Sequence, residues 1–185
     1  MNTLIFNGSP RPDGDTVALI GALTAALPGH ADMVDCYRAD ISPCVDCRAC
    51  REAFRCVIDD AMQQVYRRIR AADAIVIASP IYYSQLTGPL LGALSRLQPG
   101  FYDRMRGGKG FRDRPRRGGI LLAGGGNGSP APALATARTL LHAMGCREIA
   151  EPVMSLRTDS LPAAMDAQAL SAAAALGRSL GEGPL

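Results

Sequence analysis

Histidine, lysine and long apolar runs are scarce in this chain of 185 residues. It has two histidines and a single lysine, Lys109, and its net charge of +3 is too weak to indicate a nucleic-acid partner. Its apolar stretches are too short to span a bilayer, so we expect no membrane partner. The start, MNTLIFNGSP, lacks the basic and long apolar regions of a signal peptide. We therefore expect a protein of the reducing cytoplasm, where clustered cysteines favour metal or redox roles over structural disulfides.

The chain also lacks internal repeats and any linker that would divide it. Hydrophobic residues make up 48% of the sequence, and 185 residues are enough for one sizeable core. We expect a single domain over residues 1–185, with a cysteine-rich insertion at about 43–57.

Strand-like and helix-like segments alternate along the chain. Residues 74–78, AIVIA, are apolar throughout, as expected of a strand covered on both faces of a parallel sheet. The alternation predicts one three-layered α/β domain that binds ligands at the carboxyl ends of its strands. The expected strands are 3–7, 31–36, 74–78, 120–123 and a weak one within 148–154. The expected helices are 16–27, about 61–72, 88–97, 132–144 and 163–180, with 99–119 irregular.

Four cysteines form a C-x2-C-x2-C-x5-C run: Cys44, Cys47, Cys50 and Cys56. Two-residue gaps allow successive thiolates to converge on one centre, and four thiolates are the ligand set of an iron–sulfur cluster or a structural zinc. Because there is no second run, Cys56 is the natural fourth ligand of a single site. We favour one 4Fe–4S cluster, with zinc and free or reversibly paired thiols as the alternatives.

The loop after the first expected strand suits a small anion. Ser9 and Thr16 offer hydroxyls, Arg11 offers a charged fork, and Gly14 lets backbone N–H groups approach where a helix begins. The loop lacks the lysine of a P-loop and the spacing of a dinucleotide fingerprint, which excludes both. An ordinary capping loop is the alternative.

Two further loops suit a flat heteroaromatic ring. The loop after residues 74–78 combines a rigid turn, two aromatic rings and polar groups, typical of a site that grips a ring at its edges. Its candidate contacts are Pro80, Ile81, Tyr82, Tyr83 and Ser84. After the strand at 120–123, Gly124 and Gly125 let the backbone come close to a ligand, and Asn127 offers a hydrogen bond to a ring edge. Plain packing of the tyrosines and a simple glycine turn are the alternatives.

Basic residues gather in the glycine-rich stretch 104–117, which contains six arginines and Lys109. A solvated loop is the default interpretation. The sharper hypothesis is a mobile element near the ligand loops that recruits an acidic partner or a nucleotide phosphate.

These motifs resemble a known family. Gly8-Ser9-Pro10-Arg11 with Gly14 and Thr16 resembles the FMN-phosphate loop of the NADPH-dependent FMN reductase superfamily. Ser-Pro-Ile-Tyr-Tyr at 79–83, followed by Thr-Gly-Pro at 87–89, resembles its isoalloxazine loop. The cysteine run resembles the cluster motif of the iron–sulfur flavoprotein branch, including the five-residue last gap. Where the family usually carries asparagine, this chain has Asp15, whose carboxylate repels a phosphate unless it turns away to cap the helix.

The resemblance implies a flavodoxin-like three-layer fold with a five-stranded parallel sheet of order 2-1-3-4-5. It implies bound FMN, a 4Fe–4S cluster that exchanges electrons with the flavin, NAD(P)H as a possible reductant, and a homodimer or homotetramer. An acidic electron carrier such as a ferredoxin is a possible partner. We assign no catalytic acid or base, because the flavin performs the electron chemistry itself. The alternatives are a cluster-free NAD(P)H-dependent FMN, quinone or nitroaromatic reductase, a flavodoxin-like electron carrier, and a zinc-stabilised binding domain.

Overall fold

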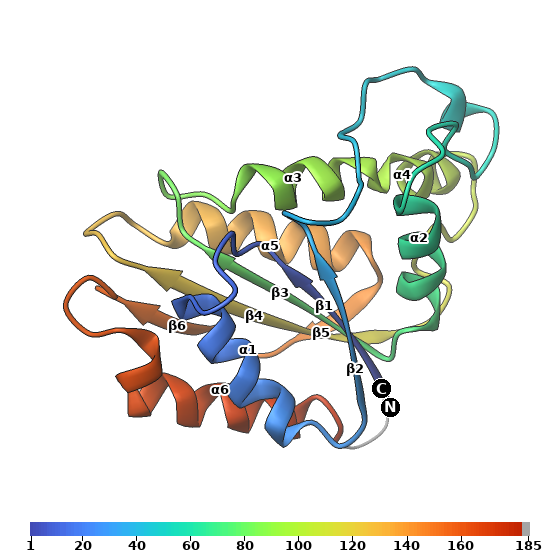
Figure 1. Ribbon diagram of the computed structural model, residues 1–185. Coiled ribbons are helices and arrows are strands. Elements are labelled where there is room, and N and C mark those ends of the chain that lie inside the picture. The colour runs from blue at the N-terminus through green and yellow to red at the C-terminus, as the bar shows by residue number, and fades with distance from the viewer. Residues whose placement is uncertain (183–185) are drawn as a thin grey trace.

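The computed structural model describes residues 1–182 and contains one parallel sheet with helices on both faces (Figure 1). The strands are β1 (Asn2–Asn7), β2 (His30–Asp35), β3 (Ala74–Pro80), β4 (Arg116–Gly124), β5 (Cys146–Ile149) and β6 (Val153–Leu156). The helices are α1 (Asp15–Ala26), α2 (Met62–Ala71), α3 (Gly88–Leu94), α4 (Gln98–Met105), α5 (Ala131–Ala143) and α6 (Ala167–Ser179). Short 3-10 turns lie at Ala49–Arg51, Ser95–Leu97 and Ala163–Met165.

The sheet has the order β2-β1-β3-β4-β5, which confirms the expected flavodoxin-like topology. The single weak strand expected within 148–154 is instead two short strands that pair with different parts of β4. β5 pairs with its start, residues 116–118, and β6 pairs with its end, residues 121–124. Pro152 lies between them and has no N–H group to donate, which is consistent with the break in the ladder.

Side chains from opposite faces of the same strands form two separate cores. Leu4 and Phe6 of β1 pack with α2, α3 and α5, whereas Ile5 packs with α1 and α6. Figure 1 shows α1 and α6 below the sheet and α3 and α5 above it. Because both faces are covered, β3 is buried along nearly its whole length, as its apolar sequence predicts.

The region 99–119 is more regular than expected. Residues 98–105 form α4, and β4 begins at Arg116 rather than at residue 120. Pro99 occupies the first turn of α4, where a missing N–H group costs nothing. Pro99 and Gly100 hide this helix in the sequence, because both residues are rare inside helices. Gly100 is needed there because a Cβ at that position would collide with the ring of Phe111.

The expectation that the basic stretch 104–117 lies near the ligand loops as a mobile element is wrong for its second half. Arg116 opens β4, so it lies at the amino ends of the strands, away from the carboxyl edge. Its side chain is fully buried and donates to the carbonyl oxygens of Arg70, Ala72 and Phe111. Arg114 and Arg116 serve the fold, because they donate to carbonyl oxygens left free at the end of α2.

In the part of the chain that the structure describes, no helix combines the length and the apolar character needed to cross a membrane.

Candidate functional site

The loop after β1 presents an open helix end. Helix α1 begins at Asp15, and its N-cap, Gly14, has no side chain to satisfy the first N–H groups. The Oγ of Ser9 accepts a hydrogen bond from the N–H of Arg11 (3.3 Å) and donates one to its carbonyl oxygen (3.0 Å), which holds the loop in shape. An uncapped helix N-terminus carries partial positive charge and free donors, so it favours an anion such as a phosphate.

The carboxylate of Asp15 is tied up by the protein. Its Oδ1 accepts a hydrogen bond from the N–H of Ala163 (2.8 Å), and its Oδ2 lies 3.4 Å from Nη2 of Arg11. Asp15 thus faces the segment before α6 as well as the exposed Arg11, and does not cap its own helix. The sequence left open whether the carboxylate would turn away to cap the helix; it does not cap the helix, and it bonds instead to a residue 148 positions away.

We expect Asp15→Asn to tighten FMN binding. The amide oxygen still accepts from Ala163, while the substitution removes one negative charge and releases Arg11 toward the anion. The gain should be about 0.2–1 kcal/mol, the range for one exposed ion pair, because Arg11 is largely in solvent. Fluorescence titration of apoprotein with FMN measures it, and a weaker affinity in the variant would contradict this account.

The loop after β3 is a strained two-residue turn. Tyr82 and Gln85 exchange backbone hydrogen bonds of 2.9 Å, and the two residues between them, Tyr83 and Ser84, have φ values of +50° and +60°. Two positive φ values define a type I′ turn, which normally takes asparagine and glycine. The backbone of any residue other than glycine is strained in this conformation, and such strain is typical of functional loops. The turn leaves Tyr83 fully exposed.

These loops meet in a cavity of about 160 Å³ at the carboxyl edge of the sheet. It is lined by nine of the expected contacts: Ser9, Arg11, Asp15, Thr16, Pro80, Ile81, Tyr82, Gly124 and Gly125. Gly14 lies beside it as the helix cap. Tyr83, Ser84 and Asn127 do not line it, and Asn127 is exposed. The expectation for these three stays a prediction about a bound ligand.

Sequence reasoning missed a fourth loop, which follows β6. Thr158 and Asp159 line the same cavity, and the N–H of Thr158 donates to the carbonyl oxygen of Gly124 (3.0 Å). The carboxylate of Asp159 lies so close to Gly125 that a Cβ on that glycine would collide with it. The signal was a polar Thr-Asp-Ser sequence after the last strand, which the weak and divided strand pattern obscured.

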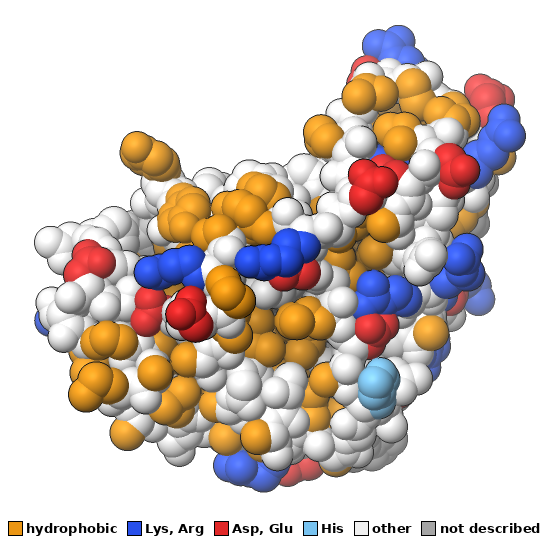
Figure 2. Space-filling view, viewed as in Figure 1, with side chains coloured by type: hydrophobic (Ala, Val, Ile, Leu, Met, Phe, Trp, Pro, Cys, Tyr) orange, Lys and Arg blue, Asp and Glu red, His pale blue; other side chains and the backbone are white. Residues whose placement is uncertain are grey.

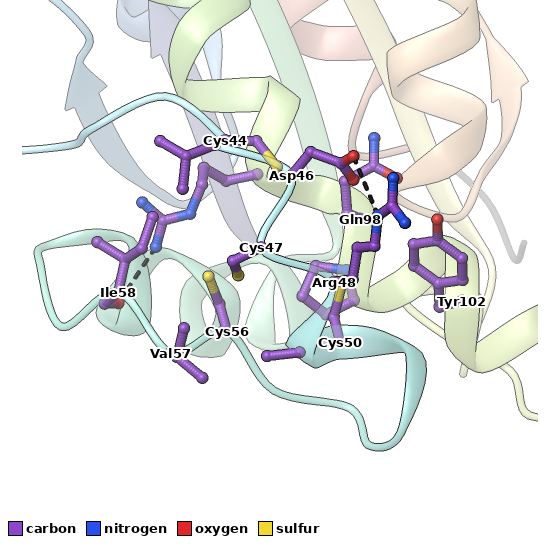
Figure 3. Close-up of a pocket in the computed structure, with 14 residues that line it drawn as sticks. Cys44, Asp46, Cys47, Arg48, Cys50, Cys56, Val57, Ile58, Gln98 and Tyr102 are labelled. Carbon is purple, nitrogen blue, oxygen red and sulfur yellow. Dashed lines mark hydrogen bonds and ion pairs between the residues drawn. The ribbon is translucent and has the colours of Figure 1, made fainter.

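A second cavity lies under the cysteine-rich segment, which protrudes at the upper right of Figure 2. The four thiols of Cys44, Cys47, Cys50 and Cys56 all line it. Figure 3 shows them around one space between the outgoing part of the loop, with three cysteines, and the returning part, with Cys56. The cavity is narrow, about 20 Å³. Among residues 1–182, no three His, Cys, Asp or Glu side chains are grouped closely enough to hold a metal ion.

Left-handed backbone outside glycine is confined to these two sites among the described residues. Asp46 and Arg48, which lie between the first three cysteines, have φ values of +49° and +65°. Tyr83 and Ser84 form the turn at the first cavity, and Arg157 (φ +63°) precedes Thr158. Such residues persist only where the surroundings hold them, and they mark functional loops more often than plain connections.

Arg96 closes the base of the cysteine segment. Its guanidinium donates to the carbonyl oxygens of Ser42 (2.8 Å) and Ile58 (3.2 Å), which flank the run, and forms an ion pair with Asp60 (2.7 Å). Burial disfavours charge on both groups, yet the pair holds the pKa of Asp60 below its usual range and that of Arg96 above it. Arg96 is 1% exposed and lines the cysteine cavity.

The other two cysteines lie apart from this cavity. Burial raises the pKa of Cys36 and of Cys146 to about 12, so both stay protonated thiols at neutral pH. They are buried in the core.

Known proteins resemble this chain in sequence and in fold. Residues 1–160 match the family described as NADPH-dependent FMN reductase. An "iron-sulfur flavoprotein" of Methanocaldococcus jannaschii is 27% identical over 127 residues, which cover 67% of this chain and 62% of that protein. One of Methanosarcina thermophila is 34% identical over 94 residues, 49% of each chain. A solved "NAD(P)H:quinone oxidoreductase from Methanothermobacter marburgensis" has a TM-score of 0.74 at 16% identity, covering 100% of this chain and 98% of that one.

The fold and its carboxyl-edge cavity thus define a flavodoxin-like domain, and the chain belongs to the NADPH-dependent FMN reductase family. The predicted resemblance to the iron–sulfur flavoprotein branch is confirmed. The chain spans 62% and 49% of the lengths of the two curated relatives described above.

Proposed function

We propose that the protein is an FMN-dependent oxidoreductase of the iron–sulfur flavoprotein type. Two separate cavities in one domain carry this proposal, because they share no lining residue and suit different cofactors. Bound FMN would accept electrons in pairs from a donor such as NAD(P)H and release them singly to a cluster and carrier.

The first cavity fits FMN on three grounds. The uncapped N-terminus of α1, with the hydroxyls of Ser9 and Thr16, offers donors for the phosphate. Glycine at 124 and 125 keeps the wall next to β4 free of side chains, and Tyr82 supplies an aromatic surface at the mouth. Thr158 and Asp159 offer polar groups for the sugar-like chain of the cofactor.

Arg11→Ala should weaken FMN binding by about 1.5–3 kcal/mol, the range for a hydrogen bond to a charged group. Arg11 is exposed and lines the cavity, and its ion pair with Asp15 is long (3.4 Å), so its side chain can turn from Asp15 to a phosphate. The matched control is Arg38→Ala. Arg38 supports the same loop by donating to the carbonyl oxygen of Pro10 (3.1 Å) but does not line the cavity. Equal FMN affinities in wild type and Arg11→Ala, by fluorescence titration, would remove the assigned role.

The second cavity fits a cluster by its donor set and by one buried group. Four thiols face one space, and the Nε of buried Arg96 has no hydrogen-bond partner within residues 1–182. An anionic sulfur centre would satisfy that donor. The cavity is narrower than a four-iron centre, but three of the cysteines lie on an exposed loop segment outside the core, so widening the cavity would not disturb the packing of the core.

A cluster-free NAD(P)H-dependent reductase is the second candidate. The observation that favours it is the narrow cavity, whose thiols are not grouped around a metal-sized space in the described chain. In that case the cysteines would act as redox-sensing thiols or have no role in turnover.

An ultraviolet–visible spectrum of anaerobically purified protein, with iron and sulfide analysis, separates the candidates. Two resolved flavin bands with broad added absorption and about four irons per chain would support the proposal. Flavin bands without iron would leave the cluster-free reductase, while NAD(P)H oxidation assays distinguish both from a flavodoxin-like carrier. Zinc without flavin would contradict both the iron–sulfur flavoprotein and the cluster-free reductase.

We further propose that the protein works as a homodimer or homotetramer. The cysteine segment protrudes at the upper right of Figure 1, on the opposite side from the loop after β4 that lines the first cavity, so association would allow it to approach the flavin of a second copy. Electrons would then pass to a carrier such as a ferredoxin. Light scattering of the flavin-loaded protein tests the association, and a monomer at working concentration would contradict it.

A further inference from the structure

One N–H donor of the Arg96 guanidinium has no hydrogen-bond partner among the described residues, although its other nitrogen atoms are fully bonded. Its Nη1 and Nη2 atoms make four hydrogen bonds, to Ser42, Ile58 and both oxygens of Asp60. Its Nε is buried, and no acceptor lies within reach of it in residues 1–182. An unpaired N–H group in the interior costs about 1–3 kcal/mol, so a bound group that accepts this hydrogen bond would recover that loss.

The surroundings point that donor toward sulfur. Arg96 lines the same cavity as the four thiols, and the pKa of the adjacent Tyr66 hydroxyl is raised first by burial and then by the thiol of Cys56. Tyr66 in turn donates to the carbonyl oxygen of Arg96 (2.7 Å), which fixes the position of the arginine backbone. The donor is therefore held rigidly and does not have to be ordered when a ligand binds.

We propose that Arg96 tunes the cluster: its Nε–H donates a hydrogen bond to a sulfur of the centre, next to Cys56, and raises its reduction potential. This rests on the proposed function, because it requires a cluster in the cysteine cavity. Hydrogen bonds to sulfur set cluster potentials, because they stabilise the additional negative charge of the reduced form. Asp60 pairs with Nη1 of Arg96 and neutralises the arginine charge, so the change in reduction potential would come from the Nε–H hydrogen bond rather than from net charge.

The test is the reduction potential of the cluster in Arg96→Lys. Lysine retains a positive charge for Asp60 but has no second nitrogen to present to the cavity. Iron and sulfide per chain should stay near the wild-type value. The reduction equilibrium should shift at least tenfold toward the oxidised form, about 59 mV for one electron, in a potentiometric titration followed by electron paramagnetic resonance.

The matched control is Arg106→Lys. Arg106 also donates to loop carbonyl oxygens, those of Cys50 and Arg51, but it is exposed and does not line the cavity. Its substitution should shift the equilibrium less than twofold, and FMN content should be unchanged in both variants. If iron-loaded Arg96→Lys protein has the same cluster reduction potential as the control, the inference about Arg96 is wrong, while the proposed cluster stands. Wild-type protein that takes up no iron after anaerobic reconstitution overturns the proposed cluster as well.

A second measurement covers the case in which Arg96→Lys fails to fold. The chain is labelled with 15N-arginine and carries Arg48→Lys, Arg51→Lys and Arg55→Lys, which remove the other arginines of the loop, together with Arg106→Lys, which removes the arginine bonded to the Cys50 carbonyl oxygen. Pulsed electron–nuclear double resonance on the reduced cluster should show coupling to a 15N nucleus. Absence of that coupling overturns the proposal without any change at Arg96.

Discussion

Substituting any one of Cys44, Cys47, Cys50 and Cys56 by serine should abolish the cluster: about four irons per chain in the reconstituted wild type, and near zero in each variant. A hydroxyl is a poor ligand for iron compared with a thiolate, and the four thiols line one cavity, so the loss of one opens the site to solvent. Iron and acid-labile sulfide analysis measures this. FMN content should not change, because the two cavities share no residue.

The control is Cys36→Ala. Cys36 follows β2 before the cysteine segment, but it is buried in the core and lies outside the cavity. This variant should keep its iron even if it loses some stability. Equal iron loss in Cys36→Ala would mean that the fold, and not ligation, limits iron uptake. Full iron in all four serine variants would show that these cysteines do not ligate the iron, whereas a reconstituted wild type without iron would leave the cluster-free reductase as the better interpretation.

Arg116→Ala should lower the free energy of unfolding by about 3–5 kcal/mol, because several buried carbonyl groups lose their donor and each unsatisfied buried group costs about 1–3 kcal/mol. The side chain is fully buried and pairs with Asp113 (2.9 Å). It also serves carbonyl oxygens from the end of α2, the 111–114 turn and the approach to β5. Its removal leaves these groups buried and unpaired. Urea unfolding followed by circular dichroism measures the change.

Arg114→Ala is the matched control, since it removes the neighbouring arginine with similar bonds, to Asp73 and to the carbonyl oxygens of Ala71 and Ala72. Because the Arg114 side chain is 42% exposed, water replaces much of what it provides, and we expect a loss of about 1 kcal/mol or less. A large effect of Arg114→Ala together with a small one of Arg116→Ala would show that burial does not set the cost.

The sequence by itself determined the features that depend on local pattern. The continuous apolar run at 74–78 predicted a strand covered on both faces, and the β-α alternation predicted the layered fold. The loop chemistry of Ser9 to Thr16 and of Pro80 to Tyr82 predicted residues that meet in one cavity, because parallel strands bring their carboxyl ends to one edge. The spacing of the cysteines predicted that their thiols face one space.

Only the tertiary structure decided which distant groups complete these sites. Arg96 lies 54 residues from Ser42 and Asp15 lies 148 residues from Ala163, and no local pattern joins either pair. A run of arginines looks the same in a sequence whether its members face solvent or, like Arg116, satisfy carbonyl oxygens inside the fold. Burial and hydrogen bonding between segments are properties of packing, so the roles of these residues are set only when the helices and strands have come together.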